Sequence, residues 1–99
     1  MANFVSCVRF TAKPGMADEV KNRIEEFGLP AGALQHFGFN TGGDSFCTVV
    51  MWASEQDLAN ARPQMIAFLD TVRDKLIELS PELGVTDPVS GPVFVNVSA

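Results

Sequence analysis

The only histidine of the chain is the side chain best suited to proton transfer at neutral pH. His36 stands between Gln35 and Phe37 in a stretch with the composition of a β-strand, where a neutral imidazole can act as a base near pH 7. Gly38 lies on the same strand face and leaves room for a ligand beside the ring. The alternative is a half-buried histidine on an edge strand, satisfied by hydrogen bonds. His36 is the candidate catalytic residue.

Three further side chains have chemistry that fits the binding of an oxygen-bearing aromatic molecule. Trp52 ends a predicted strand, and its indole can line an aromatic pocket or pack in a core or an interface. Arg9 puts a charge into an apolar strand, where it must reach solvent, pair with an acid or hold an anionic ligand. Asn40, like Gln35, carries an amide that can orient a carbonyl or quinone oxygen. Trp52, Arg9 and Asn40 are therefore candidate substrate-binding residues.

The sulfur-containing side chains give weaker signals. Cys7 and Cys47 lack the CxxC spacing of zinc or redox sites, and only Arg9 stands close enough in sequence to activate the thiol of Cys7. Both are predicted to be reduced and buried, with a nucleophilic cysteine as the alternative. Met51 can line a pocket or fill the core. One histidine without neighbouring cysteines or acids supplies too few ligands, so no metal site is expected.

Length and composition limit the classes of protein. Ninety-nine residues, of which 46% are hydrophobic, are enough for one globular domain over residues 1–99. The net charge of −5 and the lack of a basic cluster argue against binding to nucleic acid or to an anionic membrane. Apolar runs are too short for a membrane span, and Arg9 interrupts the stretch 4–10 before it can form a signal-peptide core. We expect a soluble cytoplasmic protein.

Hydrophobic periodicity predicts six elements. In order, they are a strand at 4–11, a helix at 16–27, strands at 33–41 and 46–52, a helix from Ser54 to Leu79, and a strand at 93–97. The residues 42–45 predict a hairpin between the two middle strands. Pro63 is expected to split the second helix, with Arg62 on the solvent side of its apolar stripe. Three prolines and two glycines mark 80–92 as a linker.

This order, β-α-β-β-α-β, predicts an α+β, ferredoxin-like fold with a four-stranded antiparallel sheet and both helical segments on one face. The strands are apolar on both sides, since residues 49–52 run without a polar residue and Phe94 alternates with Val93 and Val95. One helical layer covers only one face of such a sheet. A second copy of the chain is the simplest cover for the other face, so we predict a homodimer.

Three segments carry a resemblance to a known family. They are Thr11–Gly15 (TAKPG), Val49–Glu55 (VVMWASE) and Ser90–Val93 (SGPV), in this order along the chain. In them the chain resembles the dimeric α/β-barrel superfamily, and within it the antibiotic-biosynthesis-monooxygenase-like (ABM-like) group. The resemblance implies that two ferredoxin-like sheets pack face to face into a dimeric α/β barrel. Similar proteins include cofactor-independent oxygenases acting on quinols and aromatic polyketides, haem-degrading oxygenases and isomerases, so the fold alone does not fix the reaction.

The functional positions of these relatives match this chain only in part. In the haem-degrading type an Asn on the first strand, the Trp that ends the third strand and a His on the second helix line the site. Here these positions hold Cys7 and Trp52, and the second helix has no histidine. In the polyketide type an Asn four residues before the Trp and a Tyr beyond it are implicated. Thr48 occupies that Asn position, and the chain contains no tyrosine.

The resemblance therefore implies an oxidoreductase that has only some of the functional residues of these relatives. We expect a cofactor-independent monooxygenase that acts on a small hydrophobic aromatic molecule, a quinol or phenol. His36 would be the base, and the substrate site would include Trp52, Arg9 and Asn40, with Cys7, Thr48 and Met51 beside them. The alternative is a non-catalytic dimeric protein, small-molecule-binding or stress-associated. An isomerase or lyase that uses only His36 is a third possibility.

Overall fold

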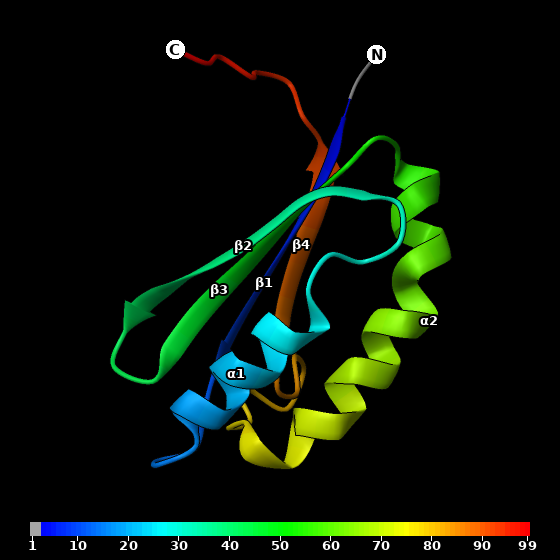
Figure 1. The fold of residues 1–99 in the computed structure, drawn as a ribbon. Helices are drawn as coiled ribbons and strands as arrows, with labels where there is room; N and C mark the ends of the chain where they lie inside the picture. The colour runs from blue at the N-terminus through cyan, green and yellow to red at the C-terminus, as the bar shows by residue number, and fades with distance from the viewer. Residues whose placement is uncertain (1–2) are drawn as a thin grey trace.

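The computed structural model describes residues 3–99 and has the predicted order of elements (Figure 1). The strands are β1 (Phe4–Thr11), β2 (Ala33–Gly42), β3 (Ser45–Trp52) and β4 (Asp87–Pro92), and the helices are α1 (Ala17–Phe27) and α2 (Glu55–Val72), followed by a short 3-10 turn at Arg73–Lys75. The strands form one antiparallel sheet in the order β2-β3-β1-β4. Both helices lie on the same face of this sheet. The ferredoxin-like α+β fold is confirmed.

Local signals in the sequence fix the ends of the elements. Gly28 ends α1 with a φ of 69°, a left-handed conformation that favours glycine, and its N–H donates to the carbonyl oxygen of Ile24. Ser54 caps α2, because its Oγ accepts a hydrogen bond of 3.3 Å from the backbone N–H of Asp57. The predicted hairpin is also present, with Gly42 paired to Ser45 across a two-residue loop.

The core lies between the sheet and the two helices, in two clusters. One contains Phe10, Ala12, Val20, Phe46, Val72 and Leu76, and the other contains Val50, Trp52, Leu58 and Ala61. The contributing positions of β1 and β3 are those that face the helices, since Phe10 pairs with Phe46 and alternate residues share a face. This layer is the part of the molecule in which a ligand can be enclosed.

The second helix differs from the prediction of a split at Pro63. The helix α2 runs unbroken from Glu55 to Val72 with Pro63 inside it. A proline removes one backbone hydrogen bond, but Leu58 and Ala61 before it and Val72 after it are all buried against the same layer. Packing on both sides of Pro63 therefore keeps the helix continuous.

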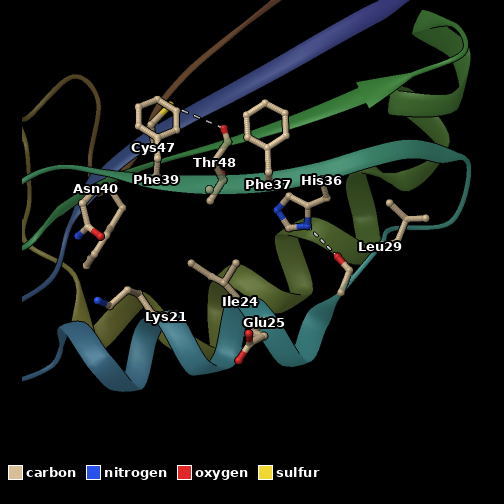
Figure 2. A pocket seen from close by; sticks show the side chains of 13 residues that line it. Lys21, Ile24, Glu25, Leu29, His36, Phe37, Phe39, Asn40, Cys47 and Thr48 are labelled. Atoms are coloured by element: carbon tan, nitrogen blue, oxygen red, sulfur yellow. Dashed lines mark hydrogen bonds between the residues drawn. The ribbon is translucent and has the colours of Figure 1, made fainter.

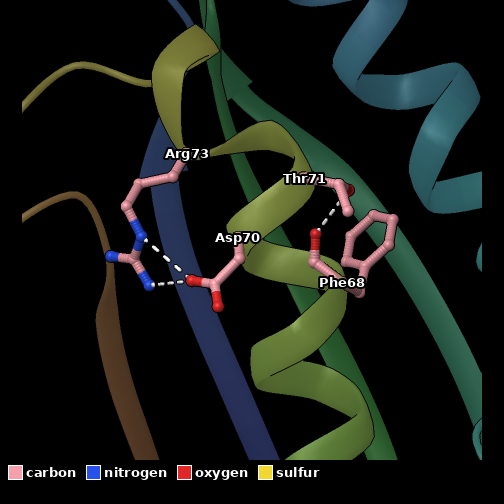
Figure 3. A network of polar contacts seen from close by, with 4 residues as sticks. All are labelled: Phe68, Asp70, Thr71 and Arg73. Atoms are coloured by element: carbon pink, nitrogen blue, oxygen red, sulfur yellow. Dashed lines mark hydrogen bonds and ion pairs between the residues drawn. The ribbon is translucent and has the colours of Figure 1, made fainter.

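The C-terminal end of α2 comes earlier than predicted. Instead of continuing to Leu79, the chain turns after Val72, and Leu76 is buried in an isolated bridge to Ala12. Polar contacts surround this end, as Figure 3 shows. Arg73 Nη2 donates to Asp70 Oδ1 at 3.0 Å, and Thr71 Oγ1 donates to the carbonyl oxygen of Phe68 at 2.6 Å. These groups are exposed, so we assign them to the helix end rather than to a site.

The fourth strand was predicted at 93–97, and this prediction is wrong. The structure places β4 at Asp87–Pro92, inside the predicted linker, where it pairs with the part of β1 from Arg9 back to Phe4. Prolines within β4 are tolerated because it is an edge strand of the sheet. Past Pro92 the ladder continues only through the N–H of Val93, which donates to the carbonyl oxygen of Asn3. Beyond that point β1 offers no further partner among residues 3–99.

The sheet face away from the helices is apolar and uncovered. Phe37, Phe39 and Val89 on this face are 47%, 51% and 61% exposed. Cross-strand pairing puts Val49 opposite both Phe37 and Cys7, so these side chains form one continuous surface. An exposed apolar patch of this kind is typical of an interaction surface. We call it the outer face.

Candidate functional site

A cleft of about 500 Å³ lies between the sheet and the helices. Most of its wall is apolar, with Met65, Phe68 and Leu69 from α2 and Ile24 and Phe27 from α1. Hydroxyl groups add polar points to the wall, from Ser6, Thr48, Thr86 and Ser90. Pockets of this size and character are typical sites for small hydrophobic molecules that carry a few oxygens.

A second cavity of about 490 Å³ opens between α1 and the β2 edge of the sheet (Figure 2). Lys21 and Ile24 of α1 and Asn40 of β2 project into it, whereas the rings of Phe37 and Phe39 point to the other side of β2. We call this cavity the groove. Ile24, His36 and Thr48 line both the groove and the cleft, so the two cavities adjoin at these three residues.

His36 stands at this junction with one nitrogen occupied and one free. Its Nδ1 lies 2.7 Å from the carbonyl oxygen of Gly28, which can only accept, so the hydrogen is on Nδ1. The ring also packs edge to face against Phe27, with centroids 6.5 Å apart. In the neutral imidazole, Nε2 then carries a free lone pair. The geometry therefore provides a fixed ring whose Nε2 can accept a proton.

Thr48 and Asn40 line the groove together with His36. The three residues were predicted to share one site. Thr48 lines both cavities, and Asn40 lines the groove. Gly38 lies between His36 and Asn40 on β2 and approaches β3 closely, because a Cβ there would stand 3.4 Å from the carbonyl oxygen of Cys47. Gly38 thus serves strand packing as well as access to the ring.

Trp52 was predicted to be able to line the substrate pocket, but it is buried in the core. Its side chain is 0% exposed and lines neither cavity. The indole Nε1 donates a hydrogen bond of 3.0 Å to Ser6 Oγ, and Ser6 does line the cleft. Because Oγ accepts from the indole, the hydroxyl hydrogen of Ser6 is available to a ligand. Trp52 can therefore reach a ligand only through Ser6.

Arg9, Met51 and Cys7 belong to the outer face by strand alternation. Arg9 Nη2 lies 2.7 Å from Asp87 Oδ2, across the β1–β4 pair. Met51 is the partner of Val5 on the same face. Cys7 contributes to the cleft wall, but its position between these residues directs its side chain outward. The structure thus separates Arg9 and Met51 from His36, Thr48 and Asn40.

Both cysteines are free thiols. Burial raises the pKa of the Cys47 thiol, and the neighbouring Cys7 raises it further, while Arg9 acts in the opposite direction. A raised pKa leaves little thiolate at neutral pH. Cys47 therefore acts as a small apolar side chain in this sheet.

Two residues of the cleft were missed by the sequence analysis, Arg62 and Ser6. Arg62 is exposed, in line with its predicted place on the solvent side, and it also lines the cleft, where it is the only charged residue among residues 3–99. No acid in residues 3–99 forms an ion pair with it. The signal was present in the spacing, because Arg62 falls four residues after Leu58 and three before Met65 on one helix face.

Neither a metal centre nor a membrane span is indicated. Within residues 3–99, no three His, Cys, Asp or Glu side chains come together as a metal-binding group. No helix in this part of the chain is long and apolar enough to cross a membrane.

Comparison with solved structures supports the fold. A candidate antibiotic biosynthesis monooxygenase from Chloroflexus aurantiacus has a TM-score of 0.74 at 12% identity, with 97% of each chain covered. A mutant of SnoaB, a cofactor-independent oxygenase from Streptomyces nogalater, has a TM-score of 0.66 at 13% identity, covering 97% of this chain and 95% of its own. A dimeric ferredoxin-like protein from an uncultured marine organism has a TM-score of 0.75 at 9% identity, covering 100% of this chain and 94% of its own.

No family model matches the sequence, and no curated protein matches it. The structural neighbours nevertheless confirm the predicted resemblance at the level of the fold, since several carry the ABM name. The chain therefore has the ferredoxin-like fold that these structures share.

Proposed function

We propose that this protein is a cofactor-independent oxygenase that acts on a small hydrophobic aromatic phenol or quinol. The observation that carries the proposal is the position of His36, whose free Nε2 stands at the junction of an apolar cleft and an open groove. The ABM-like fold supports it, because the neighbours with this fold include proteins named as oxygenases.

A phenol can reduce oxygen without help from a cofactor. His36 Nε2 takes the phenolic proton, and the phenolate passes one electron to O₂, giving a phenoxyl radical and superoxide. These combine to form a C–O bond at the ring carbon para to the oxygen, and the protonated His36 returns its proton to the peroxide. The ring C–H proton then leaves as the O–O bond breaks. The products are a para-quinone and water, so phenol and O₂ balance quinone and H₂O.

The other residues of the cleft would bind and orient the substrate. The apolar side chains of α2, Met65, Phe68 and Leu69, hold the ring and exclude water. The free hydroxyl hydrogen of Ser6 can donate to a substrate oxygen. Arg62 is an exposed residue at the wall of the cleft, and its guanidinium is the cation available to a phenolate there.

Oxygen uptake on a panel of phenols and quinols tests this proposal. Replacing His36 with Gln, which keeps an amide donor for Gly28, is expected to lower turnover by roughly 10²–10⁴-fold. Gln56→Ala, on the exposed side of α2, is the matched control and should leave turnover unchanged. Unchanged turnover in His36→Gln would remove His36 from the mechanism.

A non-catalytic binding protein is the second candidate. It is favoured by the family positions that differ here, Cys7 and Thr48, and by the absence of tyrosine. In this case the cleft would retain a hydrophobic molecule without changing it. Native mass spectrometry of the freshly purified protein separates the two, because a bound molecule that is recovered unaltered in air favours this candidate.

We also propose that the protein is a homodimer that buries its outer face. Phe37, Phe39 and Val89 are exposed there, and a solved protein with the same fold is described as dimeric. Sedimentation velocity should report two chains, and Phe39→Asp should shift the protein to one chain. Leu83→Asp, in the exposed segment before β4 and outside the strands of the sheet, should leave the dimer intact.

A cytoplasmic location is part of the same proposal. It is supported by two free thiols on neighbouring strands, which a reducing compartment maintains. The net charge of −5 argues against binding to nucleic acid or to an anionic membrane, because such binding needs a positively charged surface.

A further inference from the structure

The groove contains charged and polar side chains that the proposed reaction does not use. Lys21 of α1 and Asn40 of β2 project into it at one end, whereas His36 and Leu29 lie at the other end (Figure 2). Phe46 adds apolar surface to its wall. A cavity of about 490 Å³ with a cation and an amide at one end and an apolar wall is suited to a small amphipathic anion.

The ammonium group of Lys21 is held over the groove without a strong ionic partner. Its Nζ lies 5.5 Å from the centroid of the Phe46 ring, which lines the groove. Within residues 3–99 it forms an ion pair only with Asp18 Oδ1, at 3.7 Å, and the Asp18 side chain is 95% exposed. An ion pair of this length between solvated groups contributes little. Lys21 is therefore available to an anion in the groove.

The groove also contains one negative charge, which lies closer to its other end. Glu25 lines the groove four residues after Lys21 and three residues before Gly28, so it stands about one helical turn closer to the carbonyl group that holds His36. An anion in the groove is favoured beside Lys21 and disfavoured beside Glu25. The two charges therefore define the end at which an acidic group binds.

The length of the groove sets the size of the molecule that fits it. Lys21 precedes Gly28 by seven residues, which corresponds to about 10 Å along α1. On β2, Asn40 follows His36 by four residues, which corresponds to about 13 Å of strand. A group bound by Lys21 and Asn40 must therefore be joined to a group at His36 by a chain of several carbons.

The junction of the groove and the cleft determines where such a chain begins. In the proposed reaction the aromatic ring lies in the cleft, its hydroxyl group is at His36 Nε2, and oxygen adds at the carbon para to the hydroxyl. The para carbon then points away from the junction, which Ile24, His36 and Thr48 line. The ring carbons ortho to the hydroxyl are the ones beside the junction. A chain that enters the groove therefore starts from an ortho carbon.

We propose that the groove binds an acidic side chain of the substrate, with Lys21 paired to its carboxylate and the amide of Asn40 donating a hydrogen bond to it. The substrate class is then a phenol that carries a carboxylate on a chain of several carbons ortho to its hydroxyl. This inference rests on the proposed function, from which it takes the position of the hydroxyl, and it names the substrate class of that site.

Calorimetric titration without oxygen tests the inference, because it measures binding in the absence of turnover. The probes are ω-(ortho-hydroxyphenyl)pentanoate and its methyl ester, at low salt. Lys21→Gln should weaken the binding of the acid about fivefold and leave the binding of the ester unchanged. Lys21→Arg should retain the binding of the acid. Lys13→Gln is the matched control and should change neither, because it removes an equal charge from an exposed lysine that lines neither cavity.

Two further probes test the length of the chain and its attachment to the ring. The chain of (ortho-hydroxyphenyl)acetate is too short to reach Lys21, and ω-(para-hydroxyphenyl)pentanoate directs its chain into the cleft. Lys21→Gln should therefore leave the binding of both acids unchanged. Arg62, the cation of the cleft, is present in every variant, so it does not contribute to these differences. Equal weakening of all three acids would indicate a general effect of charge and would overturn the inference.

The outcomes separate this inference from the proposed function. If Lys21→Gln leaves the binding of the ortho pentanoate unchanged, or weakens the acid and the ester alike, the acid site in the groove is wrong, and the oxygenase proposal is still decided by oxygen uptake with His36→Gln. If the acid binds through Lys21 but no oxygen is consumed with it, the acid site stands and the oxygenase proposal fails. If neither the acid nor the ester binds, the inference is wrong.

Discussion

His36 Nδ1 lies 2.7 Å from the carbonyl oxygen of Gly28, the residue that ends α1. This bond connects the helix end to β2 and fixes the imidazole so that Nε2 is free. It therefore has a structural consequence that is independent of any reaction.

We predict that His36→Ala destabilises the fold, because it removes the bond to Gly28 and the edge-to-face contact with Phe27. The expected loss in the free energy of unfolding is about 1–2 kcal/mol. Urea unfolding followed by circular dichroism measures it. His36→Gln, which retains a donor, should lose less than His36→Ala, and equal losses would argue that the bond contributes nothing.

The Trp52–Ser6 hydrogen bond should make the effects of mutating the two residues on the free energy of unfolding non-additive. Trp52→Phe leaves a buried ring but removes the N–H, and Ser6→Ala removes the acceptor. Each single change is expected to cost about 1–2 kcal/mol, and the double-mutant cycle should give a coupling of about 1 kcal/mol. Additive single effects would mean that the two side chains do not act together.

Arg62 should give the cleft a preference for anions. An anionic aromatic probe such as anilinonaphthalene sulfonate should bind more tightly than the neutral phenylnaphthylamine, and Arg62→Gln should weaken only the anionic probe, by about tenfold. Arg62→Lys should restore most of the binding. Fluorescence titration at low salt measures both probes, and equal weakening of the two would assign Arg62 a packing role.

Cys47 should make stability depend on pH in the alkaline range. Its pKa is raised above the ordinary value of 9.0, chiefly by burial, so the folded chain holds the thiol proton more tightly than the unfolded chain does. The contribution to stability is complete below pH 9 and is lost as the pH rises through the folded pKa. Denaturant unfolding from pH 7 to pH 10.5 should therefore show a smaller decline in Cys47→Val than in the natural chain.

The sequence alone was sufficient for most of the fold, because the signals involved are local. Gly28 can adopt the left-handed conformation that ends α1, and Ser54 can cap α2 with its own side chain. The apolar residues of β3 on both faces also predicted a sheet that one helical layer does not cover. His36, Asn40 and Thr48 were identified from residue type, strand position or resemblance, and all three line the groove.

The remaining features depend on contacts between distant parts of the chain, which only the tertiary structure decided. Pro63 stays inside a helix because the residues on both sides of it pack against one layer. The position of β4 follows from which residues lie opposite β1, and this overrides the prolines that predicted a linker. Trp52 is buried and donates a hydrogen bond to Ser6, and the exposed Arg62 borders the cleft, because such contacts are made with neighbours that are remote in sequence. Local signals fix some element ends, as at Gly28 and Ser54, whereas packing decides the others and decides which side chains a ligand can reach.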